Sequence, residues 1–87
     1  DYSKALSSHG KALEIQQKAL PSNHPDLATS YNNIGLVYDS MKEYSKALSY
    51  LERALYIRQR ALPLTHPDIK TTKESIEIVK EEIIKNK

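Results

Sequence analysis

The chain has 87 residues, of which 39% are hydrophobic and 28% charged, and its formal net charge is +2. This length allows one small domain, and the composition is typical of a folded globular or repeat protein rather than a disordered one. The charge is too small, and the two signs too evenly mixed, to indicate a nucleic-acid partner. The sequence contains no cysteine, which excludes disulfides, zinc–thiolate sites and cysteine nucleophiles.

The sequence also gives no indication of a membrane segment. No stretch approaches the roughly 18 apolar residues that a membrane helix needs, and no basic and apolar leader opens the chain. We therefore expect a soluble, cytoplasmic protein that does not contact a membrane. Because the chain begins in helix-like sequence, we expect it to be a piece of a longer protein.

The sequence repeats itself. A shift of 42 residues aligns residues 1–42 with residues 43–84, and 19 of these 42 pairs are identical. The shared stretches include "YSKALS", which begins at Tyr2 and at Tyr44, and the tripeptide "HPD", which begins at His24 and at His66. A period of about 20–50 residues is typical of stacked supersecondary units.

Residues 2–20 form the first predicted helix, because they repeat the helical pattern of residues 44–62. The two copies differ at their centre, where His9 and Gly10 stand in place of Leu51 and Glu52. A glycine inside a helix costs about 1 kcal/mol relative to alanine. We expect this helix to be the less stable end of the chain, and a break near Gly10 stays open.

Three more helices follow. Their apolar residues recur at steps of three and four, which places them on one helical face. The short segment "SMKEY" joins the second and third helices and predicts that they are antiparallel. No segment has a strand pattern, so we expect an all-α fold. The apolar positions are, in order, Leu27, Tyr31, Ile34, Tyr38 and Met41; then Tyr44, Ala47, Leu48, Leu51, Ala54, Leu55 and Leu62; then Ile69, Ile76, Val79 and Ile83.

The two HPD tripeptides occupy residues 24–26 and 66–68. Proline fits the first turn of a helix, and the aspartate after it favours the positive end of the helix dipole. We interpret each tripeptide as a helix start, capped by His24 or Asn23 in the first copy and by Thr65 or His66 in the second. The same tripeptide occurs between two helices of a J-domain, but a J-domain has only one such loop. A metal site would need several ligands that converge, and a catalytic triad would need a serine beside a histidine; the sequence indicates neither.

The segment "SYNNIGLVYDSMKEYSKALSYLERAL" resembles a tetratricopeptide repeat. The residues at the spacing of that motif are Tyr31, Ile34, Gly35, Tyr38, Tyr44, Ala47, Leu51 and Ala54. The small residues allow two helices to approach closely, and the large ones fill the flanking space. The usual repeat has about 34 residues. The longer period here resembles the 42-residue repeats of kinesin light chain.

The resemblance implies an α-solenoid of antiparallel helix pairs, in which each pair has a first and a second helix. This chain would run in the order second–first–second–first. The last helix holds Lys73, Glu77 and Lys80 where the motif has its aromatic residues and glycine, so we expect it to be a polar cap. We expect one domain over residues 1–87. Its parts are the second helix of a partial repeat at 1–21, a full helix pair at 25–63 and the capping helix at 67–86.

Asn32 and Asn33 stand side by side in the middle of a helix, although asparagine is a poor helix former. The resemblance implies that first helices line a concave groove and that asparagines there hold a peptide backbone. The implied groove residues are Thr29, Asn32, Asn33, Leu36, Asp39 and Ser40, continued by Thr71, Glu74, Ser75, Ile78 and Glu82. A solvated face that binds nothing stays open as the alternative.

Tyr50 and Tyr56 are paired with Ser8 and Glu14 in the other copy, so the repeat does not require them. They are either half-buried tyrosines or part of an apolar patch on the convex side.

We therefore expect a non-enzymatic scaffold that binds a protein or peptide, with no catalytic residue, cofactor or metal. The alternative is self-association through the N-terminal helix, whose apolar face needs cover and could pair with another copy of the chain. That face comprises Tyr2, Ala5, Leu6, Ala12, Leu13 and Leu20.

Overall fold

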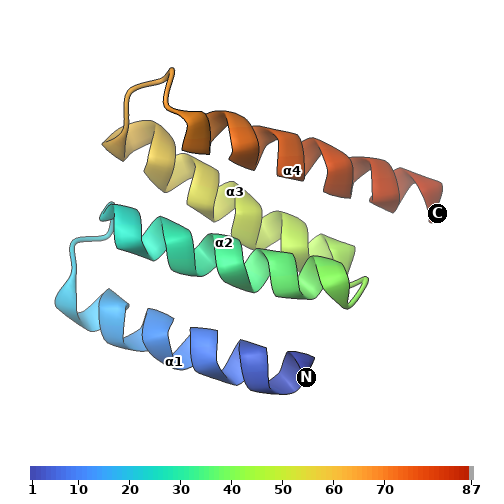
Figure 1. Cartoon of the computed structure of the whole chain (residues 1–87), viewed down its shortest axis with the longest axis horizontal. Helices are drawn as coiled ribbons and strands as arrows, with labels where there is room; N and C mark the ends of the chain where they lie inside the picture. Colours follow the sequence, from blue (N-terminus) through green and yellow to red (C-terminus); the bar gives the residue numbers. More distant parts are fainter. Residues whose placement is uncertain (87) are drawn as a thin grey trace.

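The computed structural model describes residues 1–86, which form four α-helices: α1 (Tyr2–Ala19), α2 (Pro25–Ser40), α3 (Tyr44–Ala61) and α4 (Pro67–Lys85). The helices lie side by side in chain order, with α1 and α4 outermost (Figure 1). Within residues 1–86 there is no strand, and extensive contacts join only successive helices. The predicted all-α solenoid fold is confirmed.

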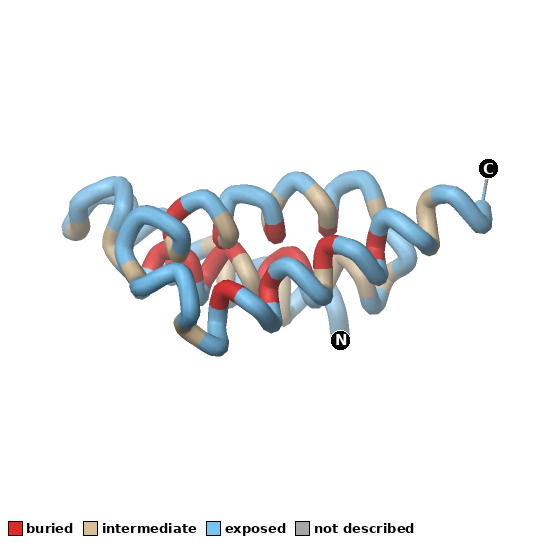
Figure 2. Tube along the Cα trace, turned by 90° about the horizontal axis from the view of Figure 1, so that it is seen from above, coloured by how far each residue is buried: buried red, intermediate tan, exposed pale blue. Residues whose placement is uncertain are grey.

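The core lies between the helices, where the buried residues gather in Figure 2. It consists of two clusters that together run from α1 to α4. The first joins α1, α2 and α3 through Leu13, Leu27, Ala28, Tyr31, Ile34, Ala54 and Ile57. The second joins α3 to α4 through Ala47, Leu51, Ile76 and Val79.

Helices α2 and α3 approach each other closely at Gly35 of α2. A Cβ atom at this position would lie 2.9 Å from Leu51 Cγ and 3.3 Å from the backbone oxygen of Ala47, both in α3. Leu51 and Ala47 are fully buried. The glycine therefore lets α2 and α3 pack more closely than any other residue would allow, as the motif predicts.

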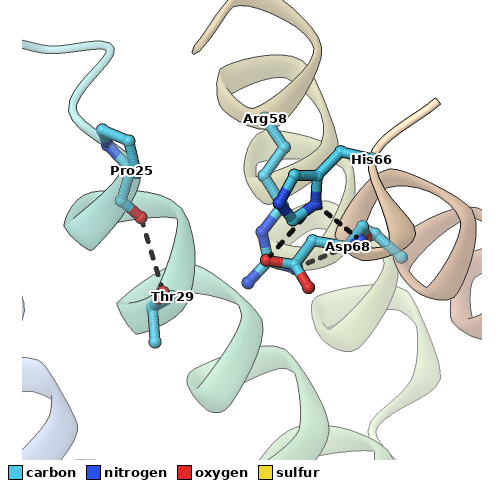
Figure 3. Close-up of polar contacts among 6 residues, drawn as sticks. Pro25, Thr29, Arg58, His66 and Asp68 are labelled. Atoms are coloured by element: carbon cyan, nitrogen blue, oxygen red, sulfur yellow. Dashed lines mark hydrogen bonds and ion pairs between the residues drawn. The ribbon is translucent and has the colours of Figure 1, made fainter. Parts of the chain in front are cut away.

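Both HPD tripeptides begin a helix. His24 Nδ1 accepts a hydrogen bond from the backbone N–H of Asp26 at 3.1 Å, and His66 Nδ1 accepts one from Asp68 at 3.0 Å (Figure 3). In each copy the cap is the histidine and not its neighbour, Asn23 or Thr65. The proline takes the first helical position in both, so the interpretation as a helix start is confirmed.

A polar contact between helices also recurs at the 42-residue period. Ser30 of α2 donates a hydrogen bond to the side-chain oxygen of Gln16 in α1. At the matching positions, Arg58 Nη1 of α3 donates to Thr72 Oγ1 of α4 at 2.7 Å. The second helix of each pair thus meets the next first helix in the same register.

Helix α1 continues through Gly10 without a break. A Cβ atom at Gly10 would have no neighbour within 4 Å, so packing does not require a glycine there. The helix buries only Leu13 fully, against α2. Its other faces are uncovered, and Ile15 is 67% exposed.

Candidate functional site

The predicted groove residues of α2 form a stripe that the core does not use. Thr29, Leu36 and Ser40 are exposed, and Asn32, Asn33 and Asp39 are half-buried. Leu36 is the one large apolar side chain among them, at 42% exposure. The stripe is therefore mainly polar and accessible.

Two hydroxyl groups of this stripe form hydrogen bonds with the backbone of their own helix. Thr29 Oγ1 donates to the backbone oxygen of Pro25 at 3.4 Å (Figure 3), and Ser40 Oγ donates to that of Leu36 at 3.1 Å. By contrast, the side chains of Asn32 and Asn33 form no hydrogen bond with any residue of the range 1–86. Their amide groups keep both donor and acceptor capacity.

The predicted continuation on α4 is also accessible. Thr71, Glu74 and Ile78 are exposed, while Ser75 and Glu82 are half-buried. Ile78 is 57% exposed and lies outside the clusters that hold α4 to α3. Ile78 is therefore accessible, and α4 exposes a second isoleucine, Ile84, at 70%.

Residues of both stripes influence the electrostatics at the start of α3. Tyr44, the first residue of α3, is half-buried. Its burial raises the pKa of its hydroxyl group, and the nearby carboxylates of Glu82 in α4 and Asp39 in α2 raise that pKa further. Two acidic groups from the predicted set are therefore close to one phenol. Tyr44 is not among the predicted groove residues, because the repeat motif already explains a tyrosine there.

Two hollows of the surface lie outside the predicted groove. A hollow of about 770 Å³ lies between the α1–α2 connection and α3, lined among others by Asn23, Tyr31, Arg53 and Arg60. A second, of about 540 Å³, lies between α3 and α4 and includes Leu55, Ile76, Lys73 and Lys80. Neither is lined by a predicted groove residue, so the sequence did not predict either hollow.

Tyr56 lines both hollows and is 61% exposed. The guanidinium of Arg60 lies 5.4 Å from the centre of its ring and donates to its hydroxyl at 3.3 Å. Tyr50, in contrast, is half-buried, with its ring 6.1 Å from that of Tyr31 and 5.5 Å from that of Tyr38. Of the two tyrosines that the repeat does not require, one packs in the α2–α3 interface and the other is a surface residue.

Two cations lie over the aromatic rings of α2. Arg53 lies 5.2 Å from the centre of the Tyr31 ring, and Lys46 lies 5.6 Å from the centre of the Tyr38 ring. Both cations come from α3. These contacts combine ring burial with an electrostatic attraction between the cation and the face of the ring.

Residues 1–86 contain no group of three or more histidine, cysteine, aspartate or glutamate side chains that could hold a metal ion. No helix in this range is both long enough and apolar enough to cross a membrane.

Comparison with known proteins gives a family. The tetratricopeptide repeat model matches residues 1–60, which cover α1, α2 and nearly all of α3. No curated protein matches the chain. Tetratricopeptide repeats are typically non-catalytic modules of protein–protein interaction. The match covers more than half of the chain, and the packing around Gly35 agrees with the motif, so the chain belongs to the tetratricopeptide repeat family.

Proposed function

We propose that this chain is a non-catalytic scaffold that binds an extended segment of a partner protein along a groove formed by α2 and α4. One observation carries the proposal. Asn32 and Asn33 are half-buried in the middle of α2 and have no side-chain partner within the described chain. Asparagine lowers the stability of a helix interior, and here neither amide forms an internal hydrogen bond that would offset that cost.

A pair of free amides suits the backbone of an extended peptide. Each amide group can donate to a peptide oxygen and accept from a peptide N–H. Binding through the backbone does not depend on the partner's side chains, so neighbouring residues would supply the specificity. Leu36 offers an apolar contact on α2, and Glu74 and Ile78 continue the surface on α4.

The groove would have an acidic end. Asp39 and Glu82 both lie close enough to Tyr44 to raise the pKa of its hydroxyl group. A partner segment with a lysine or arginine at that end would be attracted there. One helix pair and its flanking helices provide little area, so we expect weak binding.

The finer assignments belong to the same proposal. We propose that the repeat units lie at 1–21, 25–63 and 67–86 and are of the 42-residue type of kinesin light chain. Two recurrences at this period support the division: the HPD cap is found twice, and the Gln16–Ser30 contact recurs as Arg58–Thr72. A cytoplasmic location would fit a scaffold without cysteine.

Self-association through the terminal helices is the second candidate function. It is favoured by the part of the predicted α1 face that stays accessible, where Tyr2 is 51% exposed and Ala12 is exposed, whereas Leu6 and Leu13 of that face pack in the first core cluster. A closed pair of copies with α1 against α1 would cover Tyr2 and Ala12. Light scattering over a range of protein concentrations tests it, and a constant monomer mass would eliminate it.

The groove is tested by the double variant Asn32→Ala, Asn33→Ala. The probe is the tightest 12-residue peptide selected from a random displayed library on the wild-type chain, with its affinity measured by fluorescence anisotropy. Loss of two amide contacts of about 1 kcal/mol each predicts affinity about 30-fold weaker. Circular dichroism should show unchanged helix content, because alanine is the better helix former.

The matched control is Gln59→Ala, which removes an exposed amide that lines the hollow between α3 and α4. This variant should bind the peptide as the wild type does. The groove assignment is wrong if the asparagine double variant keeps full affinity, or if the control loses as much affinity as the double variant.

A further inference from the structure

Helices α1 and α3 differ at one matched pair of positions near their C-terminal ends. In α1, Lys18 forms an ion pair with Glu14 at 3.5 Å. In α3, 42 residues later, Arg60 and Tyr56 hold these positions. The guanidinium of Arg60 lies 5.4 Å from the centre of the Tyr56 ring and donates to the tyrosine hydroxyl. Both helices thus keep the cation, whereas only α1 keeps a carboxylate that neutralises it.

Arg60 lines the hollow of about 770 Å³ between the α1–α2 connection and α3, which is called the arginine hollow below. A second exposed arginine, Arg53, lines the same hollow and lies 5.2 Å from the centre of the Tyr31 ring. Within residues 1–86, no ion pair joins either arginine to a carboxylate. Each guanidinium is therefore positioned by an aromatic ring, and its charge is available to an anion from outside the chain.

Neutral hydrogen-bonding groups also line the arginine hollow. Ser22 and Asn23 come from the α1–α2 connection and Ser49 comes from α3, and all three are exposed. Figure 1 shows that this connection and the C-terminal end of α3 lie at the same end of the molecule. One carboxylate, that of Glu52, is also in the lining, so two arginines and one glutamate leave a formal charge of +1. The hollow is therefore suited to an anionic ligand that also accepts hydrogen bonds.

The spacing of the two arginines indicates the form of that ligand. Arg53 and Arg60 are seven residues apart on α3, which corresponds to about two helical turns and about 10 Å along the helix axis. A chain in the polyproline II form rises about 3.1 Å per residue with three residues per turn, so its residues i and i+3 lie on one side, about 9 Å apart. Acidic side chains at that spacing would match the two guanidinium groups.

We propose that the arginine hollow binds an extended acidic segment of a partner protein, with one carboxylate at Arg53 and a second, three residues away, at Arg60. Ser22 and Asn23 can donate hydrogen bonds to the same segment. The site is built from a second helix and a connection, and no predicted groove residue lines it. It therefore goes beyond the proposed function and does not rest on it. It also selects the opposite charge from the acidic end of the groove.

The test measures the binding of two fluorescently labelled peptides of equal composition to the full chain by anisotropy, in about 0.1 M salt. The spaced peptide separates three glutamates by pairs of prolines, which favour the polyproline II form. The clustered peptide holds its three glutamates side by side. The wild type should bind the spaced peptide at least about threefold more tightly, because only this peptide reaches both arginines at once. Added salt should weaken the binding, since the arginines are exposed.

Three single variants each lower the net charge of the chain by one and so separate this site from general attraction. Arg60→Gln should weaken the binding of the spaced peptide about three- to fivefold, the effect of one exposed ion pair. Tyr56→Glu gives α3 the carboxylate that α1 has at Glu14. It should weaken the binding at least about tenfold, because it neutralises Arg60 and repels the peptide. Lys46→Gln removes an exposed cation of α3 outside the hollow and should change the affinity less than about 1.5-fold.

Two further variants test the lining and the independence of the site. Glu52→Gln removes the opposing carboxylate and should tighten the binding of the spaced peptide about two- to threefold. The double variant Asn32→Ala, Asn33→Ala of the peptide groove should bind the spaced peptide as the wild type does. Circular dichroism should show unchanged helix content for the substitutions at residues 46, 52, 56 and 60, because all four side chains are exposed.

Four results would overturn the proposal. The first is that the wild type binds neither peptide, or binds both equally. The second is that folded Arg60→Gln and Tyr56→Glu variants keep the affinity of the wild type. The third is that Lys46→Gln loses as much affinity as Arg60→Gln. The fourth is that the asparagine double variant loses the spaced peptide, which would place the acidic segment in the peptide groove. None of these results contradicts the proposed function, which the selected peptide tests separately.

Discussion

Helices α1 and α3 have the same length, 18 residues, and share "YSKALS" at their start, yet they differ in what they bury. Helix α3 lies between two first helices and buries Ala47, Leu51, Ala54 and Ile57. Helix α1 has extensive contacts with α2 alone and buries Leu13. The sequence of a repeat determines the helix and its apolar positions, whereas the neighbours determine which of those positions are buried.

The largest expected difference between the two helices is at their shared isoleucine. Ile57→Ala should lower the free energy of unfolding by about 2–5 kcal/mol, because it leaves a cavity in the core. Ile15→Ala should change it by no more than about 0.5 kcal/mol, since that side chain is mainly in water. Urea unfolding followed by circular dichroism measures both, and equal losses would mean that α1 is covered in solution.

The two glycines, Gly10 of α1 and Gly35 of α2, should respond to replacement by alanine with opposite changes in the stability of the fold. Gly35→Ala should destabilise the fold by about 1–2 kcal/mol, because the added methyl group collides with buried Leu51 and its gain in helix propensity offsets only part of that cost. Gly10→Ala should stabilise the fold by about 0.5–1 kcal/mol, since the methyl group enters open space. Thermal unfolding midpoints should therefore move in opposite directions, and a shared direction would contradict the packing at Gly35.

The HPD loops give the smallest expected difference between the two halves. His24→Ala and His66→Ala each remove one helix cap and should each cost about 1 kcal/mol. Their hydrogen bonds differ by only 0.1 Å, so the two losses should agree within about 0.3 kcal/mol. Replacement of either histidine by serine, which also accepts from the backbone, should restore most of the stability in urea unfolding. A loss confined to one copy would show that the two caps are not equivalent.

Most of the fold could be predicted from sequence because its signals are local. Apolar spacing, the HPD start and the Leu-Pro pair that follows α1 and α3 all act within a few residues. Even so, the choice between His24 and Asn23 as the cap could not be predicted, because both offer an acceptor at nearly the same place. The continuity of α1 through Gly10 was also unresolved, because a glycine costs too little to break a helix that Leu13 holds against α2.

The surfaces were harder to predict because they depend on how helices are placed relative to one another. The Gln16–Ser30 contact requires the register of α1 on α2, which no local pattern contains. The hollow of about 770 Å³ is lined by residues of the α1–α2 connection, of α2 and of α3. The groove positions followed from a family resemblance, and their accessibility agrees with that expectation, while their binding role stays a prediction.

The confinement of extensive contacts to successive helices has a consequence for how the chain folds. Contacts that are close in sequence favour fast folding, since little loop entropy is lost before they form. Helices α2 and α3 share the most extensive interface and are joined by the shortest connection, so their pair is the natural nucleus. Folding would then spread outward to α1 and α4, and local opening would begin at those two ends. Backbone amides of α1 should accordingly exchange with solvent long before those of α3, although the two helices share so much sequence.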